Sequence, residues 1–202
     1  TMGDHKRIIF NGDGYGEAWP VEAAKRGLLN LPSTAEALPY FKSPKNIALF
    51  EKHKIFSAAE VTSRCDIMLE AYSKTLAIEG LTMAEMAHRE ILPAVLDYLR
   101  DLGETVSAKK AAAPGVPCQV EQDLIARLSG LLSRFDAKLQ ELESALLNAR
   151  GEEASPEAHA LFCRNTLFPA MQELRAAVDE MEVLVGKRYW PYPTYGDLLF
   201  SE

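Results

Sequence analysis

The stretch from Arg7 to Trp19, RIIFNGDGYGEAW, holds the residue types that could bind a calcium ion or a phosphate group. Asn11, Asp13 and Glu17 place oxygen atoms at alternate positions. The calcium-loop pattern is not met, because the glycine comes too early and no glutamate stands at the required end. The phosphate-loop spacing G-x-G-x-x-G is also missing. Asn-Gly and Asp-Gly accept the positive φ angles of a tight reversal, so the sequence favours a turn over a ligand-binding loop.

A second candidate is the Glu-x-x-His pair formed by Glu85 and His88 in EMAH. Di-iron helical bundles use two such pairs and two further inward-facing glutamates. No second Glu-x-x-His occurs in this sequence, so we favour a solvated pair near a helix edge and keep a metalloenzyme bundle as an alternative. The histidines do not adjoin a serine or cysteine in a nucleophile elbow, and no Walker-type nucleotide loop occurs. The sequence therefore predicts no catalytic, cofactor-binding or metal-binding residue.

Charge and cysteine content narrow the class of protein further. The net charge is −7, and an acidic surface repels nucleic acid and anionic membranes. Cys65, Cys118 and Cys163 are odd in number and form no CxxC, which is typical of reduced cysteines in a cytoplasmic protein. No apolar run approaches the roughly 18 residues of a membrane span. The N-terminus has no signal-peptide core, and Thr1 before Met2 suggests a fragment boundary.

The elements that would position any site begin with short helices in residues 1–56. Residues 17–29 read as a helix with Gly27 at a left-handed cap. Ser33 and Glu36 form a capping box that opens a second helix. Ser43 and Pro44 are a cap and a first-turn proline, which predicts a third helix over residues 44–53. We interpret residues 1–56 as a linker with short helices.

Long helical patterns begin at Ser57, where SAAE is another capping box. Gly80 weakens the first pattern, and whether it ends a helix is left open. The capping box from Thr82 to Glu85 predicts a restart, and Pro93 predicts a kink or local opening. The apolar residues that recur at spacings of three and four in the first pattern are Val61, Cys65, Met68, Tyr72 and Leu76.

A loop is predicted from composition for Gly103 to Pro117, and its order is left open. Beyond it lies the clearest helix, followed by a tight connection with Gly151 as the stop and Ser155 as the next cap. Pro169 predicts a second kink in the last helix. The stripe of the clearest helix is Leu124, Leu128, Leu131, Phe135, Leu139, Leu142 and Leu146, and that of the last is Leu161, Phe168, Met171, Leu174, Val178, Met181 and Val185.

The short connection at Gly151 makes its two flanking helices antiparallel neighbours. The predicted fold is therefore all-α: an antiparallel helical bundle of three to four long helices, preceded by short helices. Residues 57–202 form this bundle and its tail as one compact unit. The tail, KRYWPYPTYGDLLF, cannot be helical at Pro191 and Pro193. We expect an extended aromatic tail that closes the bundle and needs a surface to lie on.

Several long strings occur together and in a fixed order. They are HKRIIFNGDGYGEAW, EAAKRGLLNL, ALPYF, NIALFEKHKIF, AEVTSRCDIMLEAYSKTLAIEGLTMAEMA, EILPAV and the closing KRYWPYPTYGDLLF. In these strings, from about His5 through Val95 and again over the tail, the chain resembles the C-terminal region of type III glutamine synthetases. From about Gly103 to Glu182 the likeness is in pattern more than in residues.

The resemblance implies a helical structural and assembly domain of a glutamate–ammonia ligase. That family makes glutamine from glutamate, ammonia and ATP, uses divalent metals such as magnesium, and forms double-ringed oligomers. Its catalytic motifs belong to a preceding portion, and none occurs here, so no catalytic residue is transferred. The resemblance implies an inactive fragment without a cofactor, whose partners are the catalytic domain of the same chain and further copies of the parent enzyme. The acidic net charge argues against nucleic acid or a membrane as a partner.

The alternative is a stand-alone helical adaptor or scaffold without catalysis. Under either hypothesis, aromatic residues near the two ends of the chain are candidates for docking. These candidate docking residues are Phe10, Trp19, Trp190, Tyr192 and Tyr195.

Overall fold

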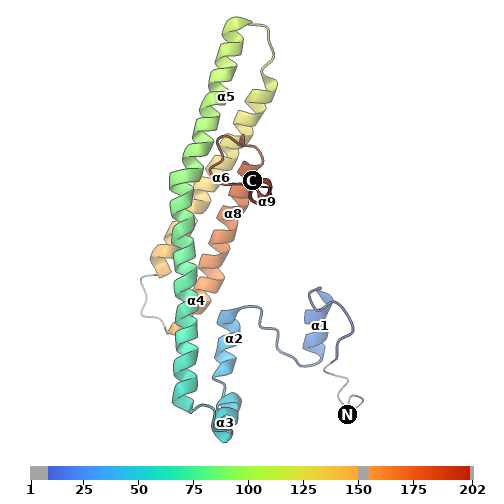
Figure 1. The fold of residues 1–202 in the computed structure, drawn as a ribbon, viewed down its shortest axis with the longest axis vertical. Coiled ribbons are helices and arrows are strands. Elements are labelled where there is room, and N and C mark those ends of the chain that lie inside the picture. Colours follow the sequence, from blue (N-terminus) through green and yellow to red (C-terminus); the bar gives the residue numbers. More distant parts are fainter. Residues whose placement is uncertain (1–8, 150–154, 201–202) are drawn as a thin grey trace. The chain divides into compact units, whose positions relative to one another are not determined.

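The computed structural model of the chain describes residues 9–149 and 155–200, and every regular element in these ranges is a helix. The predicted all-α class is confirmed. The chain divides into two compact units, and the boundary falls between Cys65 and Asp66, inside helix α4 (Ala58–Met86). The two units are described separately below (Figure 1). None of the helices in the described ranges is both long and apolar enough to cross a membrane.

The first unit contains the short helices α1 (Ala18–Lys25), α2 (Thr34–Phe41) and α3 (Pro44–Lys52). The end of α1 is as predicted, because Gly27 has a φ of 70°. The amide of Leu28 donates to the carbonyl of Ala23 at 2.9 Å, and that of Gly27 donates to Ala24 at 3.0 Å. These two bonds form a Schellman motif, which satisfies carbonyls that the helix end would leave unpaired.

The predicted helix starts in this unit are also confirmed. The Ser33 hydroxyl accepts from the Glu36 amide at 3.3 Å. Ser57 and Glu60 form a reciprocal capping box, with Ser57 N to Glu60 Oε2 at 2.8 Å and Glu60 N to Ser57 Oγ at 3.4 Å. Ser43 precedes α3 without a side-chain cap bond, and Pro44 occupies the first turn instead.

The second unit is an antiparallel bundle, as the sequence predicts. Its first helical path is α4, the π-helical turn η2 (Ala87–Ile91) and α5 (Leu92–Ala112). Helix α6 (Gln119–Ala149) returns along this path. The third path is α7 (Pro156–Phe162), the π-helical turn η3 (Cys163–Leu167) and α8 (Phe168–Glu182). Helix α6 packs against both α5 and α8 (Figure 1).

The apolar stripe of α6 forms the centre of the core. Leu128, Phe135 and Leu142 have no exposed surface. The remaining stripe residues are buried or partly buried against the same cluster. The prediction for this helix is therefore confirmed. The helices that pack against α6 cover its apolar stripe and remove it from water.

One residue of the α4 stripe is misplaced by the sequence pattern. Met68 is exposed, whereas Leu69 is fully buried. Residues at i+3 and i+4 from Cys65 fit a helical period equally well, so spacing alone does not choose between them. The buried face instead follows Val61, Cys65 and Leu69.

The predicted restart at Thr82 is wrong. Helix α4 runs without interruption through Gly80 and Thr82. The Thr82 hydroxyl donates to the carbonyl of Ile78 at 2.9 Å, so it bonds within the helix instead of capping a new one.

The predicted loop from Gly103 to Pro117 is mostly wrong, because α5 continues to Ala112. Alanine and lysine favour helix, and Thr105 and Ser107 bond back to the carbonyls of Asp101 and Gly103. Only residues 113–118 connect α5 to α6.

Both predicted proline disturbances are confirmed, and they share one form. Pro93 and Pro169 each lie in the first turn of an α-helix that directly follows a π-helical turn. The segments AHREILPAV and CRNTLFPAM align from Ala87 and Cys163, the first residues of η2 and η3. Proline has no amide hydrogen, so the ladder of backbone hydrogen bonds is interrupted before it. The π-helical turn, in which each bond spans five residues instead of four, accommodates this interruption.

The start of the third path follows the prediction in the part that is described. The Ser155 hydroxyl accepts from the Ala158 amide at 3.2 Å, and Pro156 is the first helical residue. The predicted stop at Gly151 lies outside the described residues.

The expected extended tail is only partly extended. No helix forms between Lys187 and Thr194, where the two prolines lie, but the short helix α9 (Tyr195–Leu199) follows. Helix α8 already ends at Glu182, so the prolines only keep the tail non-helical after it, and α9 begins two residues after Pro193.

Candidate functional site

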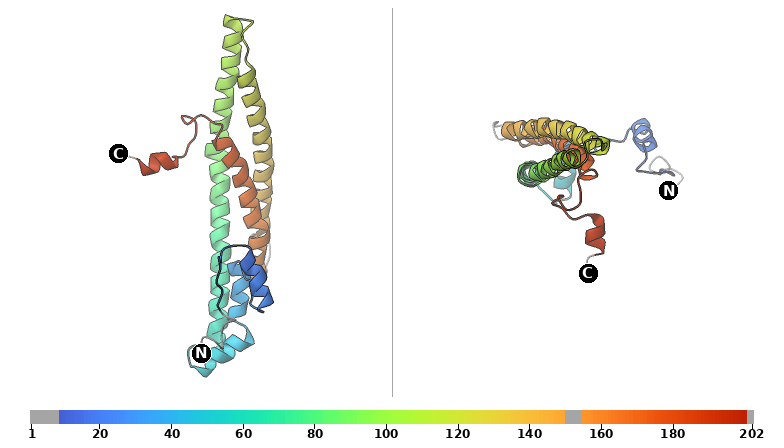
Figure 2. Two further views of the ribbon diagram at one scale, coloured as in Figure 1. Left: turned by 90° about the vertical axis from the view of Figure 1, so that its right-hand side faces the viewer. Right: turned by 90° about the horizontal axis from the view of Figure 1, so that it is seen from above.

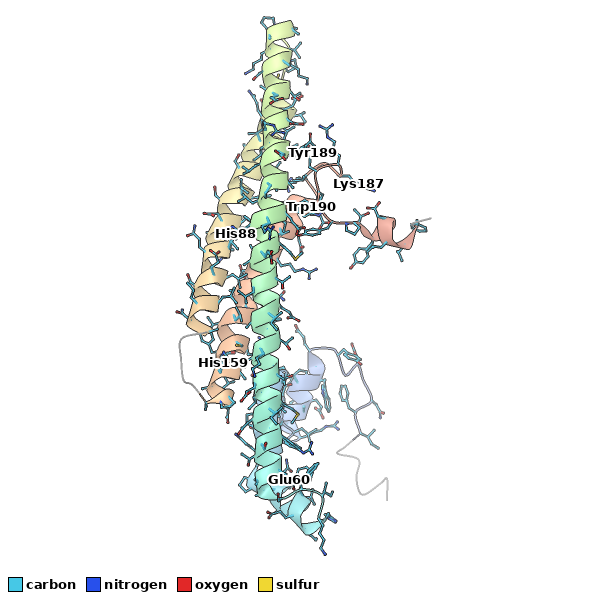
Figure 3. The ribbon with its side chains drawn as sticks, turned by 60° about the vertical axis from the view of Figure 1, so that its left-hand side comes forward. Glu60, His88, His159, Lys187, Tyr189 and Trp190 are labelled. Atoms are coloured by element: carbon cyan, nitrogen blue, oxygen red, sulfur yellow. The ribbon has the colours of Figure 1, made fainter. Side chains whose placement is uncertain are left out.

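The C-terminal tail is attached to α5 through a polar and aromatic cluster. The Tyr189 hydroxyl donates to the Asp101 carboxylate, and Arg188 donates to the same carboxylate at 3.1 Å. The rings of Tyr98 and Tyr189 lie 5.0 Å apart, and Figure 3 shows Tyr189 beside Lys187 and Trp190 at the start of the tail. The hydrogen bond from Tyr189, followed by the charges of Arg100 and Arg188, lowers the pKa of Asp101, although partial burial opposes this. Asp101 therefore stays charged and orients the start of the tail.

Beyond this cluster, the tail borders a groove of about 480 Å³. We call it the methionine groove. Its apolar lining includes Met83 and Met86 of α4, Ile91 of η2, Met171 and Val178 of α8, and Trp190 of the tail. Gln172, Arg175, Asp179 and Glu182 supply the polar part of its lining on α8. An apolar depression of this size with a few polar groups has the character of a binding site.

Tyr192 continues the wall of the methionine groove next to Trp190. The two rings meet edge to face with centroids 6.5 Å apart. Burial raises the pKa of Tyr192 to about 12, and the nearby Glu90 carboxylate adds to this rise. The buried hydroxyl finds no well-aligned hydrogen-bond partner among the described residues. Trp190 and Tyr192, both predicted as docking residues, thus pack against the bundle and help to form the groove.

Tyr195, the third predicted docking residue of the tail, lies on α9 and is 86% exposed. Thr194 and Asp197 form a reciprocal capping box at the start of this helix. Asp197 also pairs with Lys187, near the beginning of the tail. Leu198, Leu199 and Phe200 are exposed as well, so the tail holds an ordered helix whose large apolar side chains lack a covering surface among the described residues.

The pairing of Asp197 predicts a dependence of tail order on pH. The Lys187 ammonium, followed by the bonds from Thr194, lowers the pKa of Asp197 from 3.8 to about 2. A lowered pKa in the folded state stabilises the tail above pH ~4, and this contribution disappears as the pH falls through ~2.

We expect the side-chain carboxyl carbon of Asp197, followed by NMR, to titrate with a midpoint near pH ~2 in the native chain. Lys187→Gln should move that midpoint upward. Lys25→Gln, on α1, is the control and should leave it unchanged. A native midpoint close to 4 would contradict the Lys187 pair.

The two docking residues predicted near the N-terminus lie in the first unit. The rings of Phe10 and Trp19 pack against one another in a tilted arrangement, with centroids 4.7 Å apart. Between them, Asp13 Oδ1 accepts from the Tyr15 amide at 2.9 Å, and the Gly16 amide donates to the Asp13 carbonyl at 3.3 Å. The turn formed by NGDGYG therefore brings the two aromatic rings together.

The reason given for this turn from sequence is wrong in one respect. Among the described glycines, only Gly27 has a positive φ, so Gly12, Gly14 and Gly16 do not use that freedom. The Asp13 side chain makes the turn instead, through an Asx-type hydrogen bond.

Glu85 and His88 are directed to different partners. Glu85 accepts from Arg89 at 2.7 Å, and His88 Nε2 lies 2.8 Å from Glu143 Oε1 on α6. Within the described residues, no group of three or more histidine, cysteine or carboxylate side chains is placed to hold a metal ion.

Cys163 begins the π-helical turn η3 and is fully buried. Burial raises the pKa of its thiol, and a hydrogen bond with Ser73 only partly opposes this rise. A raised thiol pKa suppresses the reactive thiolate, which fits a packing role for this buried residue.

Sequence reasoning missed most of the residues around the tail. Asp101 lies just before the segment predicted as a loop, and Met83 and Met86 belong to no motif that would mark a binding site. The capping pair of Thr194 and Asp197 has a recognisable spacing, T-x-x-D, that could have indicated α9. No local signal links Lys187 to Asp197 or Tyr189 to Asp101.

Fold and site together define an all-α helical-bundle domain with an ordered aromatic tail. The chain belongs to the family of glutamine synthetase C-terminal domains, whose family model matches residues 1–110. The resemblance noted from the sequence is therefore confirmed.

Three glutamine synthetases are similar to the chain over almost its whole length. The enzyme of Butyrivibrio fibrisolvens is 38% identical over 201 residues, which are 100% of this chain and 29% of that protein. The type-3 glutamine synthetase of Dictyostelium discoideum is 33% identical over 99% of this chain and 28% of its own length. That of Bacteroides fragilis (strain YCH46) is 29% identical over 96% of this chain and 27% of its own length. The chain thus spans less than a third of the curated relatives it matches.

Proposed function

We propose that the chain is the C-terminal structural and assembly domain of a cytoplasmic glutamine synthetase. The rest of that enzyme would join ammonia to glutamate with ATP and a divalent metal such as magnesium. The similarity to three glutamine synthetases, each much longer than this chain, supports the proposal. The domain would contact the catalytic portion of its own chain and other copies of the enzyme.

The observation that carries the structural role is the ordering of α9. A capping box, an ion pair and the Asp101 cluster fix the tail in place, yet Leu199 and Phe200 remain 73% and 82% exposed. Each large apolar side chain left in water lacks about 1.5–3 kcal/mol of the free energy that its burial would contribute. An ordered helix with such side chains is typical of an interaction element.

The experiment compares the full-length enzyme with a version that ends before residue 57. Loss of the native oligomer in light scattering, or loss of folded protein, together with reduced glutamine formation, is the expected result. An unchanged oligomer with full activity would refute the assembly role. The 202-residue chain by itself should form no glutamine from glutamate, ammonia and ATP, and measurable turnover would contradict an inactive domain.

The coding sequence upstream of Thr1 separates this proposal from a stand-alone adaptor. An open frame with the motifs of the catalytic portion supports the enzyme domain. A start codon at this position would favour the adaptor.

A further inference from the structure

The methionine groove has a lining that can adapt to an apolar side chain. Methionine is flexible and polarizable, and it fills irregular spaces against other apolar groups. Met83, Met86 and Met171 all contribute to the groove, next to the indole ring of Trp190. Its volume is about 480 Å³. Displacement of water from its apolar lining by apolar side chains would be favourable.

Helix α9 has the matching character. Tyr195, Leu198 and Leu199 recur at spacings of three and four and are exposed, and Phe200 follows directly. The charge of Asp197 is already paired with Lys187. The helix can therefore enter an apolar groove without bringing an unpaired carboxylate.

The same chain does not place this helix in its own groove. Figure 2 shows α9 standing away from the long helices in its left-hand view. Only Pro193 and Thr194 separate Tyr192, which lines the groove, from Tyr195 on α9. Proline fixes its own φ angle and restricts the residue before it, so Pro191 and Pro193 make this linker stiff. The Lys187–Asp197 pair holds α9 to the beginning of the tail, so folding back would break that pair.

We propose that α9 of one copy occupies the methionine groove of a second copy, and that the exchange is reciprocal. A helix and a complementary groove on the same chain, joined by a short stiff linker, favour exchange between two copies over closure within one. Two-fold pairing would cover both apolar surfaces at once and leave no open end. This inference rests on the proposed assembly role and specifies the contact that would serve it.

The test uses two preparations of the full-length protein with different affinity tags. One has Leu199→Cys on α9, and the other has Gln172→Cys on the rim of the groove. After mixing, exchange of subunits and mild oxidation, a disulfide-linked product that contains both tags is expected. Leu199→Cys mixed with Leu147→Cys is the matched control, because Leu147 is exposed on α6 outside the groove lining. This control should give no product with both tags.

A single chain with both Leu199→Cys and Gln172→Cys tests closure within one copy. A disulfide formed only inside that chain would overturn the proposal. Absence of any link at Gln172, while the oligomer keeps its native mass, would also overturn it but leave the assembly role intact. If removal of the whole domain leaves the oligomer and activity unchanged, the assembly role itself fails.

A charge on α9 provides an independent readout. Leu199→Asp should weaken the association of copies by about tenfold or more, because an apolar contact is lost and a carboxylate is buried. Leu147→Asp is the control and should leave the association unchanged. Since both side chains are exposed in one copy, the circular dichroism of both variants should match that of the native protein. Equal association of the two variants would overturn the proposal.

Discussion

Replacement of Phe135 by alanine is expected to lower the free energy of unfolding by about 3–5 kcal/mol. Phe135 lies in the middle of α6 and has no exposed surface. The mutation removes the apolar contacts of the ring and leaves a cavity between tightly packed helices. Neighbouring side chains of the cluster, such as Leu128 and Leu142, are themselves fully buried, so they cannot fill the space without distortion.

Urea unfolding followed by circular dichroism measures this effect, and the denaturant slope shows whether the transition keeps its character. Leu147→Ala is the control, because Leu147 is on the same helix but 66% exposed. It should change stability by less than about 0.5 kcal/mol. A loss below about 1 kcal/mol for Phe135→Ala would contradict a closed core around this helix.

The second large effect is expected at Gly80. A Cβ atom there would lie 3.1 Å from Leu146 Cδ2 and 3.5 Å from Leu167 Cδ1. Leu146 and Leu167 are buried at 6% and 0% exposure, so they cannot move aside into solvent. Gly80→Leu should therefore cost about 1–3 kcal/mol through overpacking, despite the better helix propensity of leucine.

Gly130→Ala is the matched control for Gly80, because no atom outside its own helical turn lies within 4 Å of the added Cβ. This change should raise the free energy of unfolding by about 0.5–1 kcal/mol, since alanine has the higher helix propensity. Opposite signs at the two glycines are thus expected in the same unfolding assay. A stabilising effect of Gly80→Leu would show that the helices do not approach closely at this point.

The role of Gly80 illustrates how sequence and tertiary structure differ in what they reveal. From the sequence, a glycine in a helical pattern reads as a weakness and leaves the end of a helix open. In the fold, α4 passes through Gly80 without a break, and the missing side chain makes room for Leu146 and Leu167. The close approach involves residues 66 and 87 positions away in sequence, so no local pattern could predict it.

The loop expected at Gly103 to Pro117 failed for a related reason. Glycine, threonine and serine are loop formers on average, but Thr105 and Ser107 satisfy their hydroxyl groups within α5. Lys109 pairs with Glu121 across the connection to α6. Composition does not report such partners, whereas the Ala-Lys run that follows is fully compatible with helix.

The sequence by itself determined the all-α class, most of the helices and several of their ends. Stripes at spacings of three and four, capping residues, prolines and the glycine cap at Gly27 act between near neighbours, so their effects can be read locally. It also identified the aromatic tail and the family. Only the tertiary structure decided what these parts form together: the Tyr189–Asp101 contact, the methionine groove, and the uncovered face of α9. The contact and the groove depend on side chains that helix packing brings together. The uncovered face depends on the lack of a packing partner for α9 among the described residues. Helix packing is a property of the whole bundle and cannot be read from local sequence.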